Sequence, residues 1–169
     1  MGKPRALLVA WLATALLAAC GFQLRGSYSL PFDRIYTALP ETNELHAQLK
    51  RSIGTGSNAR VIDAPKDAQA TLLILSDRNA KNILSLAATG QAREFQLVRN
   101  FTFRVVDGRG RDWLPQTQIE IHRDISFSDN LVLSKDLEEA LLWRDIQADL
   151  VQQIMRRLAA SRAPREVIE

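Results

Sequence analysis

The sequence predicts an α+β domain in which two helices pack on one face of a mixed, mostly antiparallel four-stranded sheet. Two segments repeat apolar residues at steps of three or four, which is typical of half-buried helices. Two further segments alternate apolar and polar residues, which is typical of strands with one buried face. A layer of helices on one face of a sheet is the simplest way to bury the apolar stripe of each helix and the apolar face of each strand.

The first expected elements are a strand and a helix. Arg34–Leu39 has the composition of a strand. Glu41–Ile53 is expected to be helical, with Thr42 or Asn43 as its N-cap and Gly54 at its end. Its apolar face repeats at steps of four: Leu45, Leu49 and Ile53.

The middle of the chain is expected to be rich in strands. Val61–Ile62 is a possible short strand. Thr71–Ser76 and Ile83–Ala88 are either two strands or the halves of one long bent strand. Thr89–Gly90 is expected to form the next turn.

A hairpin follows, with Arg93–Val106 and Gln118–Phe127 as strands and a turn at Asp107–Gly110. Arg99 and Arg123 interrupt the apolar registers, so each is expected to reach the sheet's rim or to pair with a carboxylate. The opposite face of the strands is polar and open to solvent or to a partner. It carries Gln96, Asn100, Thr102, Arg104, Gln118, Glu120 and His122.

The last expected element is a long helix over Ser134–Ala160, with Ser134 as its N-cap. Acidic residues near its start suit the helix dipole: Asp136, Glu138 and Glu139. Its apolar stripe consists of Trp143, Ile146, Leu150, Ile154 and Leu158. Residues 161–169 have no periodicity and are expected to be a flexible tail.

The first twenty residues have the features of a lipoprotein leader. Lys3 and Arg5 precede an uncharged, mostly apolar run of fourteen residues, Ala6–Ala19, which is shorter than a membrane span. Leu17–Cys20 reads Leu-Ala-Ala-Cys and looks like a bacterial lipobox. In such a motif the chain is cleaved before the cysteine, here Cys20, which is acylated and becomes the first residue. The alternatives are an ordinary signal peptide with an incidental cysteine and a small core cysteine.

The leader sets the expected organisation of the chain. Residues 1–19 are a signal peptide, 20–31 a lipid-anchored tether, 32–160 a single αβ domain and 161–169 the tail. Loss of the leader leaves 20 basic and 19 acidic side chains, so the excess charge that would attract nucleic acid largely disappears. Gly21 follows the cysteine where inner-membrane lipoproteins carry aspartate, which favours the periplasmic face of the outer membrane.

Motifs for catalysis and metal binding are missing from the sequence. It has two histidines, one cysteine and no G-x-S-x-G segment, so we predict neither a metal site nor an enzyme. Residues 54–59 fit G-x-G-x-x-A formally. Because that segment ends a helix and does not follow a strand, we interpret it as a flexible turn.

Three groups of residues together resemble the lipopolysaccharide-assembly lipoprotein family LptE, also called RlpB. The first is Leu17–Gly26, a lipobox followed by Cys-Gly-aromatic-x-Leu-Arg. The second is Thr89–Leu97, similar to the family's turn and strand entry. The third is Ile125–Asn130 with Leu133–Asp136, similar to its strand end and long-helix start.

The resemblance implies an αβ sandwich without enzymatic activity or cofactor. It implies N-acyl and S-diacylglycerol groups on Cys20, a complex with the outer-membrane β-barrel LptD, and a role as plug and assembly aid for that barrel. It also implies binding of lipopolysaccharide during delivery to the cell surface. The alternative is a free-standing, periplasm-facing lipoprotein that binds an envelope glycan or lipid.

The resemblance also nominates binding residues. Lys135 falls where the family has a lysine implicated in lipopolysaccharide binding, and a lysine there opposes the helix dipole. A second basic family position falls on Ala88, where Arg93 across the turn can substitute. Lys or Arg can neutralise phosphates of lipid A, which adds two further candidates near loop ends: Arg109 and Arg111.

Overall fold

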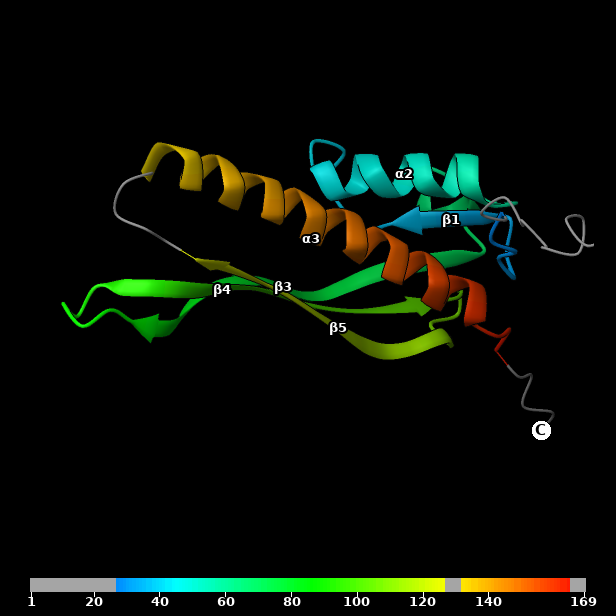
Figure 1. Ribbon diagram of the computed structural model, residues 1–169. Helices are drawn as coiled ribbons and strands as arrows, with labels where there is room; N and C mark the ends of the chain where they lie inside the picture. The colour runs from blue at the N-terminus through cyan, green and yellow to red at the C-terminus, as the bar shows by residue number, and fades with distance from the viewer. Residues whose placement is uncertain (1–26, 127–131, 165–169) are drawn as a thin grey trace, which may run out of the picture.

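The computed structural model describes residues 27–126 and 132–164, which form a sheet covered on one face by two helices (Figure 1). The leader and Cys20 lie outside the described residues. The elements, in order, are β1 (Arg34–Thr37), α2 (Glu44–Gly56), β2 (Arg60–Val61), the 3-10 turn η1 (Pro65–Asp67), β3 (Ala70–Leu86), β4 (Ala92–Val106), β5 (Asp112–Ser126) and α3 (Val132–Ala160).

The sheet has five strands in the order β2-β1-β3-β4-β5, so the expectation of four strands is wrong by one. The added strand is the two-residue β2, which pairs parallel to β1. Such a short strand carries too little periodicity to be recognised with certainty from sequence. β1 is also parallel to β3, whereas the long strands β3, β4 and β5 pair antiparallel. The expected α+β class and the one-sided helix layer are confirmed.

The two apolar runs before the first hairpin turn form one bent strand, β3, and not two strands. Its pairing with β4 shifts register between Ile74 and Ser76 and again between Ile83 and Ser85. Such bulges bend a strand and add an unpaired residue. β5 is longer than expected and begins at Asp112, because Pro115 is tolerated on a strand that has a partner on one side only.

The core lies between the helices and the middle of the sheet. Phe101 and Phe103 of β4 are fully buried, and their rings lie 5.7 Å apart. Trp113 is partly buried and packs on the core. Its ring meets Phe32 edge-on at 5.6 Å, and its Nε1 donates to the Gln69 carbonyl.

Both hairpin turns are glycine turns, as expected. Gly90 and Gly110 have φ values of 82° and 79°, a region that side chains with a Cβ rarely adopt. The second turn is also held by Asp107, which accepts hydrogen bonds from the backbone of Arg109 and Arg111. Burial raises the pKa of Asp107, but these bonds and the Arg111 guanidinium outweigh it, so the pKa lies below its ordinary value.

The helix bounds differ from the expectation at three ends. Asn43 caps α2 by accepting from the Leu45 backbone N–H, but α2 continues past Gly54 to Gly56. An exposed glycine costs a helix only about 1 kcal/mol, so it does not have to end one. α3 begins at Val132, so Ser134 lies within the helix and is not its N-cap, because nothing in Val132–Leu133 breaks a helix.

Both arginines that interrupt the apolar registers pair with carboxylates, which was one of the two alternatives: Arg99 with Asp77 of the neighbouring strand β3, and Arg123 with two residues of α3. Arg99 is buried, forms a double hydrogen bond with Asp77, and donates to Gln147 of α3. Arg123 contacts Asp145 and Asp149 of α3 at 2.8 and 3.3 Å. The hydrogen bond to Asp145 is the main reason that the pKa of Arg123 lies above its ordinary value.

Candidate functional site

Lys135 lies in the first turn of α3, next to the end of the sheet where the β3–β4 hairpin turns. Its Nζ donates to Glu138 Oε2 at 2.6 Å, and 18% of its side chain is exposed. The ion pair one turn along the helix gives Lys135 a local stabilising contact, which the helix-dipole argument omitted. An anion that binds Lys135 therefore competes with Glu138.

The other three candidate cations are divided between the two ends of the sheet. Arg93 is exposed near the start of β4, at the same end as Lys135. No hydrogen bond or ion pair joins these two side chains in the described part of the chain. Arg109 and Arg111 lie at the opposite end, in the β4–β5 turn, where Arg111 pairs with Asp107 at 2.8 Å. The structure therefore places Arg93 and Lys135 at one end of the molecule and Arg109 and Arg111 at the other, so the four residues do not form one cluster.

Lys81 is a further cation at the Lys135 end, and the sequence analysis missed it. Its Nζ lies 2.6 Å from Glu139 Oε2 and 4.6 Å from the centre of the Phe95 ring. The ion pair connects β3 to the first turns of α3. Lys81 lies between the two apolar runs of β3, so only the continuous strand reveals its position beside the helix.

Exposed aliphatic side chains occur on the same two elements, β3 and α3. On β3, Ile83, Leu84 and Leu86 are 58%, 49% and 60% exposed. On α3, Leu137 and Leu141 are 66% and 61% exposed. We call residues 81–95 and 135–142 the hairpin end. Single exposed leucines are common, but five exposed aliphatic side chains on two elements that an ion pair connects give this end an apolar character.

The polar face of the sheet is uncovered, since both helices lie on the other side (Figure 1). Its side chains are organised by hydrogen bonds between neighbouring strands. Gln96 donates to Asp124 at 3.1 Å, and Gln118 donates to Asn100 at 3.2 Å. The face is therefore an ordered polar surface.

Neither a metal site nor a membrane-spanning helix is found among the described residues. Within 27–126 and 132–164, no three His, Cys, Asp or Glu side chains gather where they can hold a metal ion. None of the helices in these two ranges has the length and apolar character needed to cross a membrane.

Comparisons with known proteins agree on one family. The family model described as "LptE: Lipopolysaccharide-assembly" matches residues 32–158. A protein of Pectobacterium atrosepticum called LPS-assembly lipoprotein LptE is 26% identical over 95% of this chain and 88% of its own. A protein of the same name from Yersinia enterocolitica is 31% identical over 90% of this chain and 74% of its own.

Solved structures give the same fold. The solution structure of an uncharacterized lipoprotein B from Nitrosomonas europaea matches with a TM-score of 0.72 and 35% identity, over 83% of this chain and 91% of its own. The crystal structure of the rare lipoprotein B from Shewanella oneidensis matches with a TM-score of 0.65 and 24% identity, over 76% and 95%. At that identity the second match supports the fold only.

Proposed function

Because the chain belongs to the LptE lipopolysaccharide-assembly family, we propose that it binds lipopolysaccharide at the hairpin end while docked in the outer-membrane barrel LptD. Family membership gives it a part in lipopolysaccharide assembly and makes it a non-enzymatic lipoprotein. The observation that carries the proposed site is the combination of cations and exposed aliphatic side chains at one end of the molecule.

The chemistry of the hairpin end matches both parts of lipopolysaccharide. Lipid A carries phosphates, for which Lys135 and Arg93 supply positive charge. It also carries acyl chains, which gain about 25 cal/mol for each Å² of apolar surface removed from water. Leu137 and Leu141, one turn apart on α3, offer such a surface at the same end of the molecule.

The anchor is the second part of the proposal. Cys20 carries N-acyl and S-diacylglycerol groups that hold the chain at the periplasmic face of the outer membrane. Each buried CH₂ contributes about 0.8 kcal/mol, so several acyl chains on one residue hold a protein durably. Growth with radioactive palmitate tests this, because Cys20→Ala removes the acceptor and should abolish the label. Label that persists on the variant would remove Cys20 from the proposal.

The third part is the barrel complex, in which the chain acts as plug and assembly aid. The lumen of an outer-membrane barrel is polar, so a protein placed inside it needs polar outer surfaces. The uncovered face of β4 and β5, with exposed Gln118, Glu120 and His122, has that character. Extraction of the outer membrane in mild detergent should therefore yield the chain together with a large barrel. A solitary protein would contradict the complex and favour a free-standing lipoprotein.

Lipopolysaccharide binding is tested by Lys135→Asp in the full-length protein. The reversal of charge should weaken binding of purified lipopolysaccharide about tenfold, the loss of one charge-assisted contact, and should leave the circular dichroism spectrum unchanged. The matched control is Lys66→Asp, an exposed lysine in η1, which should bind as the wild type does. Equal affinity of the Lys135 variant and the wild type would exclude Lys135 as a contact.

A further inference from the structure

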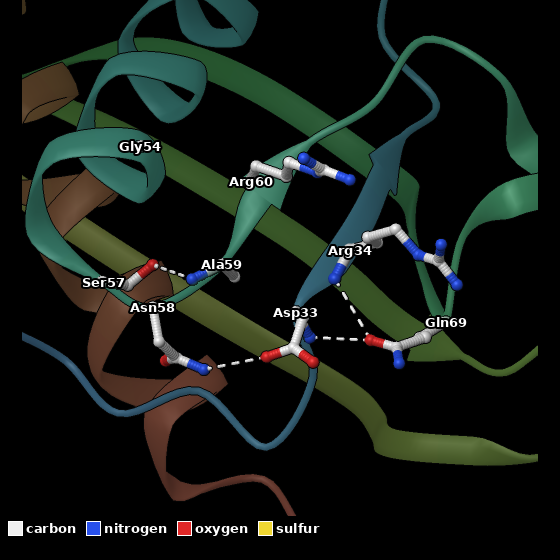
Figure 2. A pocket seen from close by; sticks show the side chains of 8 residues that line it. All are labelled: Asp33, Arg34, Gly54, Ser57, Asn58, Ala59, Arg60 and Gln69. Carbon is white, nitrogen blue, oxygen red and sulfur yellow. Dashed lines mark hydrogen bonds between the residues drawn. The ribbon is translucent and has the colours of Figure 1, made fainter.

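A cavity of about 580 Å³ lies at the end of the domain where β1 and β2 begin (Figure 2). It is lined by Asp33, Arg34, Gly54, Ser57, Asn58, Ala59, Arg60 and Gln69. These residues come from β1, β2, the end of α2 and the segments that join them. Neither the lipopolysaccharide site nor the proposed barrel surface uses any of them.

Most polar groups of the cavity wall are committed to holding the backbone. Asn58 accepts from the Leu30 N–H at 2.7 Å and donates to the Leu30 carbonyl at 3.1 Å. Gln69 Oε1 accepts from the N–H groups of Asp33 and Arg34. Ser57 accepts from the Ala59 N–H and donates to the Ile53 carbonyl. These bonds make the wall a fixed frame.

The guanidinium groups of Arg34 and Arg60 take no part in that frame. The two residues are direct partners in the parallel pairing of β1 and β2, so their side chains leave the sheet on the same face. Figure 2 shows both extending in the same direction, away from Ser57 and Asn58. Among the described residues neither guanidinium has a hydrogen-bond or ion-pair partner. The one carboxylate of the wall, Asp33, is approached by Asn58 at 3.4 Å.

Two like charges on directly paired strand residues destabilise the sheet, unless an anion lies between them. Each guanidinium presents several N–H donors in a planar fork that matches phosphate oxygens. The pair therefore has the chemistry of a phosphate site, with Asp33 selecting against ligands that carry a larger negative charge.

The cavity also lies close to the point from which the chain leads to its anchor. Tyr28 donates its backbone N–H to the Gly56 carbonyl, and Leu30 is held by Asn58, so the first described residues run along the cavity. Ser27 follows Cys20 by seven positions in the chain. In any conformation this stretch spans at most about 25 Å, which keeps the cavity near the headgroups of the membrane that holds Cys20.

We propose that the Arg34–Arg60 cavity binds the phosphate of a phospholipid headgroup in that membrane. The contact fixes how the domain sits on the bilayer surface, which a flexible lipid anchor alone does not do. The inference rests on the proposed function for the anchor at Cys20 and is separate from lipopolysaccharide binding at the hairpin end.

The test uses the full-length acylated protein in an uncharged maltoside detergent. It is titrated with the short-chain lipid dihexanoyl phosphatidylglycerol and, separately, with inorganic phosphate, and the heat of binding is measured. Arg34→Gln combined with Arg60→Gln should weaken lipid binding at least tenfold, since two charged hydrogen-bond donors are lost. The matched control, Arg78→Gln with Arg144→Gln, removes two exposed arginines elsewhere and should stay within twofold of the wild type.

Thermal unfolding of the double variant checks that it is folded. If it is not, Arg60→Lys keeps the charge but loses the planar fork, and should weaken lipid binding several-fold. Equal loss in the control pair, or no loss in the cavity variants, would overturn the site. Inorganic phosphate that binds as tightly as the lipid would overturn the assignment to a headgroup.

Lipopolysaccharide binding by the same variants separates the two proposals. The cavity variants should bind lipopolysaccharide as the wild type does. If they lose it, the cavity belongs to the lipopolysaccharide path, and the phospholipid assignment is wrong while the proposed function stands. If Lys135→Asp leaves the affinity for lipopolysaccharide unchanged, Lys135 is excluded as the contact of the proposed function. The result for the cavity is not affected by that outcome.

Discussion

The two ends of α3 have opposite surroundings although they belong to one continuous helix. In its second half, Ile146, Leu150 and Ile154 are fully buried against the sheet and α2. In its first turns, Leu137 and Leu141 are more than half exposed, and the contacts to the sheet are ionic. We call β1, β2, α2 and residues 146–158 of α3 the packed end, in contrast to the hairpin end.

This difference shows where stability and where function reside. The packed end contributes ten of the 22 buried residues of the core, whereas the hairpin end contributes none of them. Burial of apolar surface is the main source of folding free energy. At the hairpin end the strands continue past α2, so their apolar side chains have no second helix to cover them (Figure 1). Regions with few buried contacts open at low cost and are the usual source of binding surfaces.

The largest expected effect comes from removing apolar atoms at the packed end. Leu150→Ala should lower the free energy of unfolding by about 2–5 kcal/mol, because it leaves a cavity in the core. Leu141→Ala, on the same helix but 61% exposed, should change it by less than about 0.5 kcal/mol. Urea denaturation measures both. Similar losses for the two variants would mean that the leucines of the hairpin end are covered in solution.

The next effect concerns the ion pairs of the two sheet arginines, one within the sheet and one between the sheet and α3. Asp77→Ala should lower the free energy of unfolding by about 1–3 kcal/mol, because the buried guanidinium of Arg99 then keeps only its hydrogen bond to Gln147. Asp145→Ala should cost less than about 1 kcal/mol, since Asp145 is exposed and Arg123 keeps Asp149. Chemical denaturation of both variants measures the two losses of unfolding free energy. A larger loss for Asp145→Ala than for Asp77→Ala would contradict the expected order.

The two glycine turns offer a smaller and closely matched comparison. A Cβ added at Gly90 or Gly110 meets no atom within 4 Å, so alanine at either position costs only backbone strain, about 1 kcal/mol. Gly110→Ala should lower the free energy of global unfolding by that amount. Gly90→Ala should lower it by less, because the hairpin end can open locally without global unfolding. Amide hydrogen exchange near each turn measures the difference, and equal global effects would argue against local opening.

The smallest effect sharpens the role of Lys135. Glu138→Gln removes the carboxylate that competes for Lys135 Nζ, so lipopolysaccharide affinity should rise about two- to threefold, the size of one exposed ion pair. Asp136→Asn removes one neighbouring charge without touching that pair and serves as the control. A fall in affinity for Glu138→Gln would show that the ion pair positions Lys135 for binding.

The fold was largely predictable from the sequence because its signals are periodic. The apolar steps of both helices and the alternation in β4 and β5 depend on local spacing, and the structure confirms the elements they predicted. The short β2 was expected only as a possible strand at Val61–Ile62, since two residues give no period. The early start of α3 was missed, since a serine can lie inside a helix. The bends in β3 hid its continuity, because a bulge breaks the alternation on which the prediction relies.

The candidate sites were less accessible to sequence reasoning. Lys135 and Arg93 came from resemblance to a family, and nothing in their spacing showed that they share an end of the molecule. Lys81, Glu139 and the exposed leucines gather there only through the pairing of β3 with β4 and the path of α3. Arg34 and Arg60 lie 26 positions apart in the chain, and only the parallel register makes them neighbours.

The clamp that Asn58 and Gly56 place on Tyr28 and Leu30 has a mechanical consequence. Tyr28 also donates through its hydroxyl to Gln152 of α3 at 3.3 Å. Force applied through the proposed anchor at Cys20 would therefore reach the ends of both helices, through Tyr28, before it reached β1. Such a force would act on the junction of α2 and α3, and the edge of the sheet would not be unzipped strand by strand.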